Sequence, residues 1–231
     1  TRTDLINDHF KRYRERLLQE VATDAAKTAN YTGRASFSPD VLAALGRLQR
    51  EHFVPAPARR KAYENRPLPI GYGQTISQPF IVALMTDLLD LRSTDRVLEI
   101  GTGCGYQTAM LAELVAEVFT VEVITKLQEG ARDRLSSIGY TNIRYKIGDG
   151  WTGWPKEAPF DAIIVTAAAS AIPRVLTAQL GRGGRMVVPV GQQNETQFLM
   201  RRTRKPNGAL LEERGLPVAF VPLVKNSTGN T

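Results

Sequence analysis

The sequence contains very little cysteine and histidine. Cys104 is the one cysteine among 231 residues, and His9 and His52 are the two histidines. A single cysteine excludes an internal disulfide and fits a reducing compartment, so we expect a cytoplasmic protein. Neither histidine has a Ser/Asp or Cys partner pattern, and we assign neither a catalytic role. Because no His/Cys/carboxylate cluster has metal-site spacing, we also expect no metal.

Long apolar runs are also missing. No run approaches the roughly 20 residues that a membrane-spanning helix needs. The charged stretch 1–19 lacks the apolar core of a signal peptide, and we expect no membrane partner. Hydrophobic residues make up 42% and charged residues 23% of the chain, as in an ordinary globular protein. We predict a single domain over 1–231, with a helical N-terminal cap and insertion over 1–70 and a cofactor-binding α/β core with C-terminal strands over 71–231.

The charge is strongly basic, with a net charge of +7 from 30 basic and 23 acidic residues. Two basic clusters stand out, and such clusters occur in nucleic-acid-binding proteins. We favour a solvated helix face and a solvated turn, because no aromatic residue interleaves with the second cluster. The clusters are Lys11, Arg12, Arg14 and Arg16, and Arg201, Arg202, Arg204 and Lys205.

Strands and helices alternate through the second half of the chain. Apolar strands are expected at 97–100, 118–123, 143–147, 162–166 and 185–190, with helices at 106–116, 125–138 and 172–179. Such alternation predicts a doubly wound α/β fold with a mostly parallel sheet covered on both faces. Strand-like segments at 197–203, 209–213 and 217–223 predict an antiparallel tail.

The first half is mostly helical in pattern. Helices are expected at 5–22, 41–50 and 80–91, with a short helix near 58–63 and a loop at 28–39. Ser38 and Pro39 form a capped start for the second of these helices. The proline-rich stretch 53–70 is expected to be irregular.

A glycine-rich loop follows the first strand of the alternation. Gly101, Gly103 and Gly105 stand between an apolar run and a helical pattern, which is how parallel α/β proteins bring bare backbone against a nucleoside-containing cofactor. The G-x-G-x-x-G dinucleotide pattern needs its third glycine one residue later, and no Gly-Lys-Ser/Thr of a P-loop follows. Taken alone, the loop still leaves a dinucleotide site open.

The acidic residue before this loop favours a different cofactor. Glu99 stands where a pyrophosphate would sit badly. S-adenosylmethionine has no phosphate and carries a sulfonium cation, so we predict that it is the cofactor and that S-adenosylhomocysteine is the product. The residues expected to bind it here are Glu99, Gly101, Thr102, Gly103 and Gly105.

Two further strand ends carry candidate cofactor ligands. Glu122 ends the second strand, where a carboxylate can accept both ribose hydroxyls of an adenosine. Asp149, followed by Gly150, can accept the exocyclic amine of adenine while the glycine lets the ring approach. The alternatives are an exposed strand-end acid for Glu122 and an ordinary Asp-Gly turn for Asp149.

The segment 67–79 is rich in proline, glycine and hydroxyl side chains and precedes a helix. We expect it to be irregular and rigid. Ser77 and Pro79 fit a helix start, so Ser77 is either an N-cap or part of a site for an anion such as a substrate carboxylate.

Small residues from Thr166 to Ser170 end the fourth strand and leave room for a polypeptide substrate, or form a plain strand-to-helix connection. The Asn/Asp-Pro-Pro-aromatic motif of enzymes that methylate base amines is absent here. Cys104 lies in the cofactor loop, where it is a small filler rather than the nucleophile that cytosine methylation needs.

These motifs resemble the protein-L-isoaspartate O-methyltransferase family of the bacterial type, over about residues 53–223. The most specific match is Leu-Pro-Ile-Gly-Tyr-Gly-Gln-Thr-Ile-Ser-Gln-Pro at 68–79, which general methyltransferases do not carry. The other matching stretches are 96–107, 148–151, 159–167, 183–191 and 220–223.

The resemblance implies a seven-stranded, Rossmann-like methyltransferase fold. It also implies methyl transfer from S-adenosylmethionine to the free α-carboxylate of L-isoaspartyl residues in damaged proteins and peptides, which begins repair through a succinimide. It implies that Ser77 is the active-site serine and contacts substrate. It further implies that the segment Gln74, Thr75, Ile76 and Ser77 binds the cofactor and that Thr166 and Ala167 border the substrate.

The chain departs from the family pattern at three places. Cys104 stands where bacterial members usually have serine, Glu122 is followed by Val123-Ile124 where a basic residue is common, and 22–37 looks inserted. Two rival functions stay open: a nucleic-acid methyltransferase, suggested by the charge, and a non-catalytic module that keeps the fold. We expect no nucleic-acid partner.

Overall fold

The computed structural model describes the backbone of residues 2–224 and the side chains of residues 10–224. The side chain of His9 lies outside the described residues. The packing divides the chain into two compact units, Thr1–Asp87 and Leu88–Thr231. The assignment of both units to a single domain stays a prediction. Across the part of the chain that the structure describes, every helix is too short or too polar to cross a membrane.

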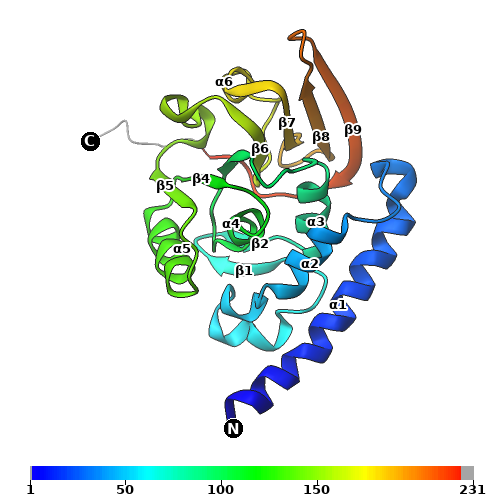
Figure 1. Ribbon diagram of the computed structural model, residues 1–231, viewed down its shortest axis with the longest axis vertical. Helices are drawn as coiled ribbons and strands as arrows, with labels where there is room; N and C mark the ends of the chain where they lie inside the picture. The colour runs from blue at the N-terminus through cyan, green and yellow to red at the C-terminus, as the bar shows by residue number, and fades with distance from the viewer. Residues whose placement is uncertain (1, 225–231) are drawn as a thin grey trace. The chain divides into compact units, whose positions relative to one another are not determined.

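The first unit is mainly helical (Figure 1). Helix α1 buries Leu17, Val21 and Ala25, which recur every fourth residue and therefore share one face. The role of this unit as an N-terminal cap, with the predicted bounds 1–70, stays a prediction. Its elements are α1 (Arg2–Thr32), α2 (Pro39–Arg47), η1 (Arg50–His52), η2 (Ala56–Lys61), β1 (Leu68–Gly71), β2 (Gln74–Ile76) and α3 (Pro79–Asp87).

Helix α1 is longer than the sequence predicts, so the expected loop at 28–39 is wrong in its first residues. The Thr28 hydroxyl donates to the Asp24 carbonyl at 2.8 Å, and the Thr32 hydroxyl donates to the Thr28 carbonyl at 3.2 Å. Both polar side chains are thus satisfied inside the helix. Gly33, with a φ of +68°, supplies the left-handed residue that ends it.

Helix α2 begins as predicted, because the Ser38 side chain accepts a hydrogen bond from the Val41 amide at 3.3 Å. It ends earlier than expected, at Arg47, and a separate 3₁₀ turn, η1, contains Arg50 and the exposed His52. Helix α3 also ends early, at Asp87 instead of residue 91.

The expectation that the segment 67–79 is irregular is wrong. Strands β1 and β2 pair antiparallel, with Leu68 opposite Ile76. Tyr72 and Gly73 form the turn and both adopt positive φ, +54° and +70°. A two-residue turn with this geometry matches the twist of a hairpin. The prolines hide the strand pattern, because β1 contains a proline that cannot donate to a ladder.

The second unit is built on a seven-stranded sheet with the order β5-β4-β3-β6-β7-β8-β9. Strands β3 to β7 run parallel, and β8 and β9 are antiparallel. This confirms the predicted fold class. The strands are β3 (Arg96–Ile100), β4 (Glu117–Glu122), β5 (Ile143–Ile147), β6 (Phe160–Val165), β7 (Leu180–Val190), β8 (Gln197–Arg204) and β9 (Leu210–Val218).

The predicted pair of final strands, 209–213 and 217–223, is wrong. One strand, β9, covers the first segment and continues through Pro217 to Val218. An edge strand tolerates Pro217 because its outer side has no ladder to complete. The chain then returns to the sheet at an isolated bridge, where the Ala168 amide donates to the Val221 carbonyl at 2.8 Å.

Helices of the second unit cover both faces of this sheet. They are α4 (Tyr106–Ala112), α5 (Thr125–Ser137) and α6 (Arg174–Ala178), with 3₁₀ turns η3 (Gly150–Thr152) and η4 (Pro155–Glu157). Glu99 of β3 bonds to Thr108 of α4, whereas the neighbouring Leu98 and Ile100 pack in one cluster with Leu176 of α6. Because side chains alternate along a strand, α4 and α6 lie on opposite faces.

A buried arginine ties β7 to the segment that leads into β3. The Arg185 guanidinium donates to the carbonyls of Leu89, Asp90 and Asp161 and to the Asp95 carboxylate, at 2.5, 2.6, 3.1 and 2.7 Å. Arg185 and Asp95 are both buried. A buried ion pair is sensitive to loss of one partner, because the other charge is left without compensation.

We therefore predict that Arg185→Met lowers the free energy of unfolding by about 3–5 kcal/mol, because Asp95 stays buried and loses its partner. Chemical denaturation measures the change. The control is Arg182→Met on the same strand, where the exposed guanidinium contacts only the Pro206 carbonyl at 3.4 Å. Equal stability losses in the two variants would contradict the prediction.

Candidate active site

Four loops of the second unit meet at one edge of its sheet. They follow β3, β4, β5 and β6, which are adjacent and parallel, so their carboxyl ends lie on the same side. Ligands of open α/β sheets bind at this edge, where the strand order reverses. The predicted residues on these loops are Gly101, Thr102, Gly103, Gly105, Glu122, Asp149, Gly150, Thr166 and Ala167.

The loop after β3 is built from glycines in left-handed conformations. Gly101, Gly103 and Gly105 have φ values of +98°, +54° and +87°. A Cβ on Gly101 would lie 2.4 Å from the Thr166 Oγ1, and a Cβ on Gly105 would lie 2.9 Å from a Leu135 methyl carbon. Both the conformation and the space at these positions therefore require glycine.

Thr166 holds this loop against the end of β6. Its hydroxyl lies 2.7 Å from the Gly101 carbonyl oxygen and 3.0 Å from that of Ile100, and it donates to both. Its amide also donates to the Ile100 carbonyl, at 2.9 Å. The hydroxyl proton thus serves the loop, so a substrate contact of Thr166, which stays a prediction, would use the oxygen as an acceptor. The neighbouring Ala167 is buried.

Glu122 holds the same loop from β4. Its Oε2 accepts from the Gly103 amide at 2.9 Å, and its Oε1 accepts from the Val123 and Ile124 amides at 2.9 and 3.0 Å. A carboxylate offers about four acceptor positions, so these three bonds leave room for one further donor. The structure places Glu122 beside the loop, as the spacing suggests; its ribose contact stays a prediction.

Glu99 lies beneath the loop, in the interior of the unit. It is fully buried, and its Oε2 accepts from the Thr108 and Thr120 hydroxyls, both at 2.6 Å. The Thr102 hydroxyl lies 2.6 Å from that of Thr120, so these side chains form one buried network. Direct contact of Glu99 with a cofactor stays a prediction, while its hydrogen bonds support the loop from below.

Burial raises the pKa of Glu99 to about 8. Loss of hydration is the main cause, because it disfavours the carboxylate, and the hydrogen bonds from Thr108 and Thr120 oppose the shift only in part. The negative charge of Glu122 raises the pKa slightly further.

Asp149 caps the turn that follows β5. Its Oδ1 accepts from the Trp151 amide at 2.8 Å, so the Asp-Gly turn is present, and this bond uses one of the two carboxylate oxygens. Gly150 is buried, and a Cβ there would lie 2.5 Å from Ile100 Cγ2. The two nearby tryptophans serve packing: Trp151 donates to the Leu223 carbonyl at 3.1 Å, and Trp154 packs edge-on against a phenylalanine.

Cys104 is buried in the same loop. Its carbonyl accepts from Arg134 of α5 at 2.8 Å, a contact that links the loop to the helix. No sequence pattern marks Arg134 as a partner of this loop. Thr108 and Thr120 are not predicted from the sequence either, because only the register of β3 with β4 and the packing of α4 bring these two side chains to Glu99.

The remaining predicted residues belong to the first unit. Gln74, Thr75 and Ile76 form β2, and the half-buried Ser77 follows directly. The Ser77 carbonyl accepts from the guanidinium of Arg50 at 2.8 Å. Arg50 is fully buried and also donates to the Ala62 carbonyl at 2.8 Å. Sequence reasoning missed Arg50, because no local pattern marks a partner that lies 27 residues away.

Ser77 is not the residue that caps the Phe80 amide at the start of α3. The Asn65 Oδ1 accepts from this amide at 3.0 Å. The Ser77 hydroxyl is thus not needed for that cap, which weakens the purely structural explanation of Ser77.

Acidic partners compensate two arginines of the second basic cluster. Arg201 pairs with Asp90 and Glu213 at 2.5 and 3.2 Å, and Arg202 pairs with Glu212. Arg204 donates to the Thr177 carbonyl at 2.7 Å. The Arg201–Glu213 and Arg202–Glu212 pairs thus link β8 to β9 and compensate part of the positive charge of the cluster.

The sheet order and the glycine loop define a Rossmann-like methyltransferase. A family model described as protein-L-isoaspartate(D-aspartate) O-methyltransferase matches residues 28–228, and the chain belongs to this family. A relative in Syntrophobacter fumaroxidans, named protein-L-isoaspartate O-methyltransferase 2, is 50% identical over 217 residues, which cover 94% of this chain and 88% of the relative. A relative in Vibrio cholerae with the name protein-L-isoaspartate O-methyltransferase is 55% identical over 187 residues, covering 81% and 88%.

Solved structures of the same family have the same fold. One named protein-L-isoaspartate O-methyltransferase superposes with a TM-score of 0.80 at 27% identity, covering 92% of this chain and 66% of that chain. A beta-aspartate methyltransferase from Plasmodium falciparum, in complex with S-adenosyl-L-homocysteine, superposes with a TM-score of 0.76 at 25% identity, covering 94% and 98%.

We predict that Gly101→Ala lowers the free energy of unfolding by about 2–4 kcal/mol, through positive φ and overpacking against Thr166. It should also weaken binding of S-adenosylmethionine, because the loop must move. Denaturation and calorimetric titration measure the two effects. The matched control is Gly130→Ala in α5, where nothing lies within 4 Å of the new Cβ. There we expect a gain of about 0.5–1 kcal/mol. If Gly101→Ala proved as stable as the control, the predicted clash between a Cβ at residue 101 and Thr166 would be refuted.

The raised pKa of Glu99 predicts a pH dependence of stability. Between 4.5 and about 8, the folded state holds a proton that the unfolded state has lost. Glu99 therefore contributes stability that is fully present below pH 4.5 and is lost as pH rises through about 8. Within this window, the free energy of unfolding of the wild type, measured relative to that of Glu99→Gln, should fall by about 1.4 kcal/mol per pH unit. Parallel denaturation curves at several pH values measure it, and a pH-independent difference would show that Glu99 is ionised when folded.

Proposed function

We propose that this protein transfers a methyl group from S-adenosylmethionine to the free α-carboxylate of L-isoaspartyl residues in damaged proteins and peptides. The ester product closes to a succinimide, whose hydrolysis returns some normal aspartate. Membership of the protein-L-isoaspartate O-methyltransferase family carries this proposal. The glycine loop, held on both sides by Thr166 and Glu122, supports it independently.

The loops of the second unit fit this cofactor. The three positive-φ glycines leave bare backbone at the edge of the sheet, and Gly101 approaches Thr166 too closely for any side chain. Glu122 has acceptor capacity left for a ribose hydroxyl, and Asp149 has a second oxygen for the adenine amine. Acidic side chains at both positions suit a cofactor with a positive charge and no phosphate.

S-adenosylmethionine supplies an electrophilic methyl group, whose bond to sulfur breaks with the electron pair returning to sulfur as the carboxylate oxygen bonds to carbon. A carboxyl group with a pKa of about 4 is already ionised at neutral pH. The chain therefore needs no general base to remove a proton from it. The residues must instead align the carboxylate and exclude water from it.

Ser77 is the residue to which we assign this alignment. Its hydroxyl donates a hydrogen bond to the carboxylate oxygen that does not attack, which directs the other oxygen toward the methyl carbon. Ser77 is half-buried, and its carbonyl accepts a hydrogen bond from Arg50. Because Asn65 caps the Phe80 amide, the Ser77 hydroxyl is not needed for that cap. Gln74, Thr75 and Ile76 precede it in β2, where we propose that they line the cofactor.

The partners that we propose are isoaspartyl proteins and peptides, and not nucleic acid. The pairing of Arg201 and Arg202 with Asp90, Glu212 and Glu213 supports this choice. We also propose a cytoplasmic location, which is consistent with Cys104 being the one cysteine of the sequence and with the site of synthesis of the cofactor.

Ser77→Ala should lower kcat for methylation of an isoaspartyl peptide by roughly 10- to 100-fold, as expected for one lost hydrogen bond to a charged group. The dissociation constant of S-adenosylmethionine should change little. A tritiated methyl-transfer assay and calorimetry measure the two quantities. Ser136→Ala, on the exposed surface of α5, is the matched control and should behave as wild type.

Two different results would count against this proposal. Unchanged kcat in Ser77→Ala would reject the role of Ser77 but not the reaction. Methyl transfer by the wild type to RNA, with none to the isoaspartyl peptide, would reject the reaction itself.

A further inference from the structure

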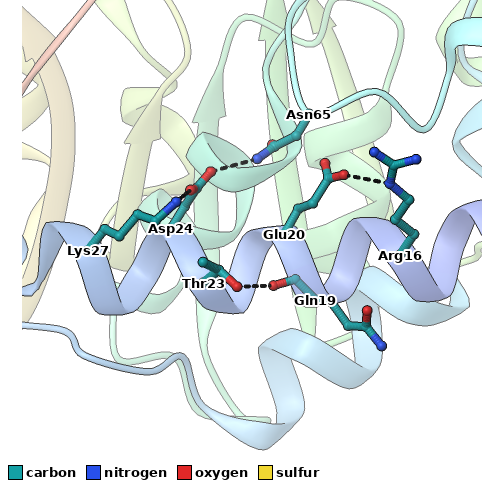
Figure 2. Close-up of a pocket in the computed structure, with 7 residues that line it drawn as sticks. All are labelled: Arg16, Gln19, Glu20, Thr23, Asp24, Lys27 and Asn65. Atoms are coloured by element: carbon teal, nitrogen blue, oxygen red, sulfur yellow. Dashed lines mark hydrogen bonds and ion pairs between the residues drawn. The ribbon is translucent and has the colours of Figure 1, made fainter.

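Helix α1 is connected to the segment that carries Ser77 through two side chains. Asn65 Nδ2 donates to the Asp24 carboxylate of α1 at 2.9 Å. The other end of the same amide, Oδ1, accepts from the Phe80 amide in the first turn of α3 at 3.0 Å. Figure 2 shows Asn65 and Asp24 pointing toward each other across a surface hollow. Asn65 therefore joins α1 to the start of α3.

Asp24 determines which way the Asn65 amide faces. An asparagine side chain carries a donor at one end and an acceptor at the other, whereas an ionised carboxylate can only accept. Asp24 therefore selects the orientation in which Nδ2 points to α1, and this leaves Oδ1 for the Phe80 amide. Without Asp24, the Phe80 amide alone favours this orientation, and the Asn65 side chain loses its anchor on α1.

The position of Phe80 matters because Ser77 stands just before α3. The first amides of a helix have no partner within the helix, so an external acceptor fixes its start. Asn65 supplies that acceptor at Phe80, while Arg50 holds the Ser77 carbonyl at 2.8 Å. Two distant side chains thus hold the backbone from the Ser77 carbonyl to the Phe80 amide, directly after the residue that carries the hydroxyl.

We propose that α1 is a positioning element of the methyl-transfer reaction, acting on Ser77 through Asp24 and Asn65. The proposal rests on the proposed role of Ser77. Neither Asp24 nor Asn65 is assigned a contact with the reacting atoms, so both are positioning residues. Displacement of a reacting group by about 1 Å costs up to roughly 100-fold in rate, so a small shift of the α3 start is enough to matter.

The first test compares single variants in the methyl-transfer assay. Asn65→Ala should lower kcat roughly 10-fold, a partial misplacement by the same principle, and the KM for S-adenosylmethionine should stay within about twofold. Asp24→Ala should lower kcat by a smaller factor, and Asp24→Asn should restore most of the loss because its amide oxygen still accepts from Asn65. The matched control is Glu20→Ala, one turn earlier on α1, whose carboxylate pairs with Arg16 at 2.9 Å.

The second test is a double-mutant cycle with Ser77→Ala. If Asn65 acts through Ser77, Asn65→Ala should have little further effect on kcat once the hydroxyl is gone. A purely structural role would instead lower kcat by the same factor in both backgrounds. Amide exchange at Phe80 gives a direct reading of the lost cap, and it should be faster in Asn65→Ala than in wild type.

The outcomes separate the two proposals. If Ser77→Ala lowers kcat but Asn65→Ala and Asp24→Ala do not, the positioning role is overturned and the proposed function stands. Additive losses in the cycle also overturn the positioning role. If Ser77→Ala has no effect, the proposed role of Ser77 fails first. Asp24 lies half-exposed on α1, so Asp24→Ala should fold and remain decisive even if Asn65→Ala unfolds.

Discussion

The close contact between Gly101 and Thr166 is the constraint on which the carboxyl edge of the sheet depends. No side chain fits at Gly101, and the Thr166 hydroxyl bonds to the carbonyl that this glycine exposes. The contact joins the ends of β3 and β6, the two strands between which the connectivity changes direction. Glu122 completes the arrangement from β4 through the Gly103 amide. The loop therefore has a fixed course before any ligand arrives, which lowers the entropy lost on binding.

A reaction that needs no general base places unusual demands on a protein. Polar side chains act on backbone groups in each unit: Arg50 on the Ser77 carbonyl and Asn65 on the Phe80 amide in the first, and Thr166 on the Gly101 carbonyl in the second. Each of these bonds fixes a segment of the backbone. This distribution is what alignment catalysis requires, because its rate depends on the placement of groups and not on their acidity.

The sequence predicts all five parallel strands, and β5 matches its predicted bounds, whereas β7 begins at Leu180, ahead of the predicted 185, because glycines and arginines fill its first half. It fails at the β1–β2 hairpin, where Pro69 hides the strand pattern and Tyr72 adopts a left-handed conformation that its residue type does not suggest. The positions of the glycine loop and of Glu122 at the carboxyl edge of the sheet can be predicted from their spacing in the sequence. Arg50 and Asn65 do not, because their contacts depend on tertiary packing across 27 and 15 residues. Ligand contacts of all these residues stay predictions.

The burial of Glu99 changes the charge that this side chain presents beneath the glycine loop. With a pKa of about 8, this carboxyl is mostly neutral at physiological pH, so it does not repel a phosphate as its place in the sequence suggests. Of the two acidic residues, Glu122 is the one whose carboxylate bonds to the glycine loop, through the Gly103 amide. The acidic residue that is most conspicuous in the motif therefore supports the loop as a hydrogen-bond acceptor for Thr108 and Thr120.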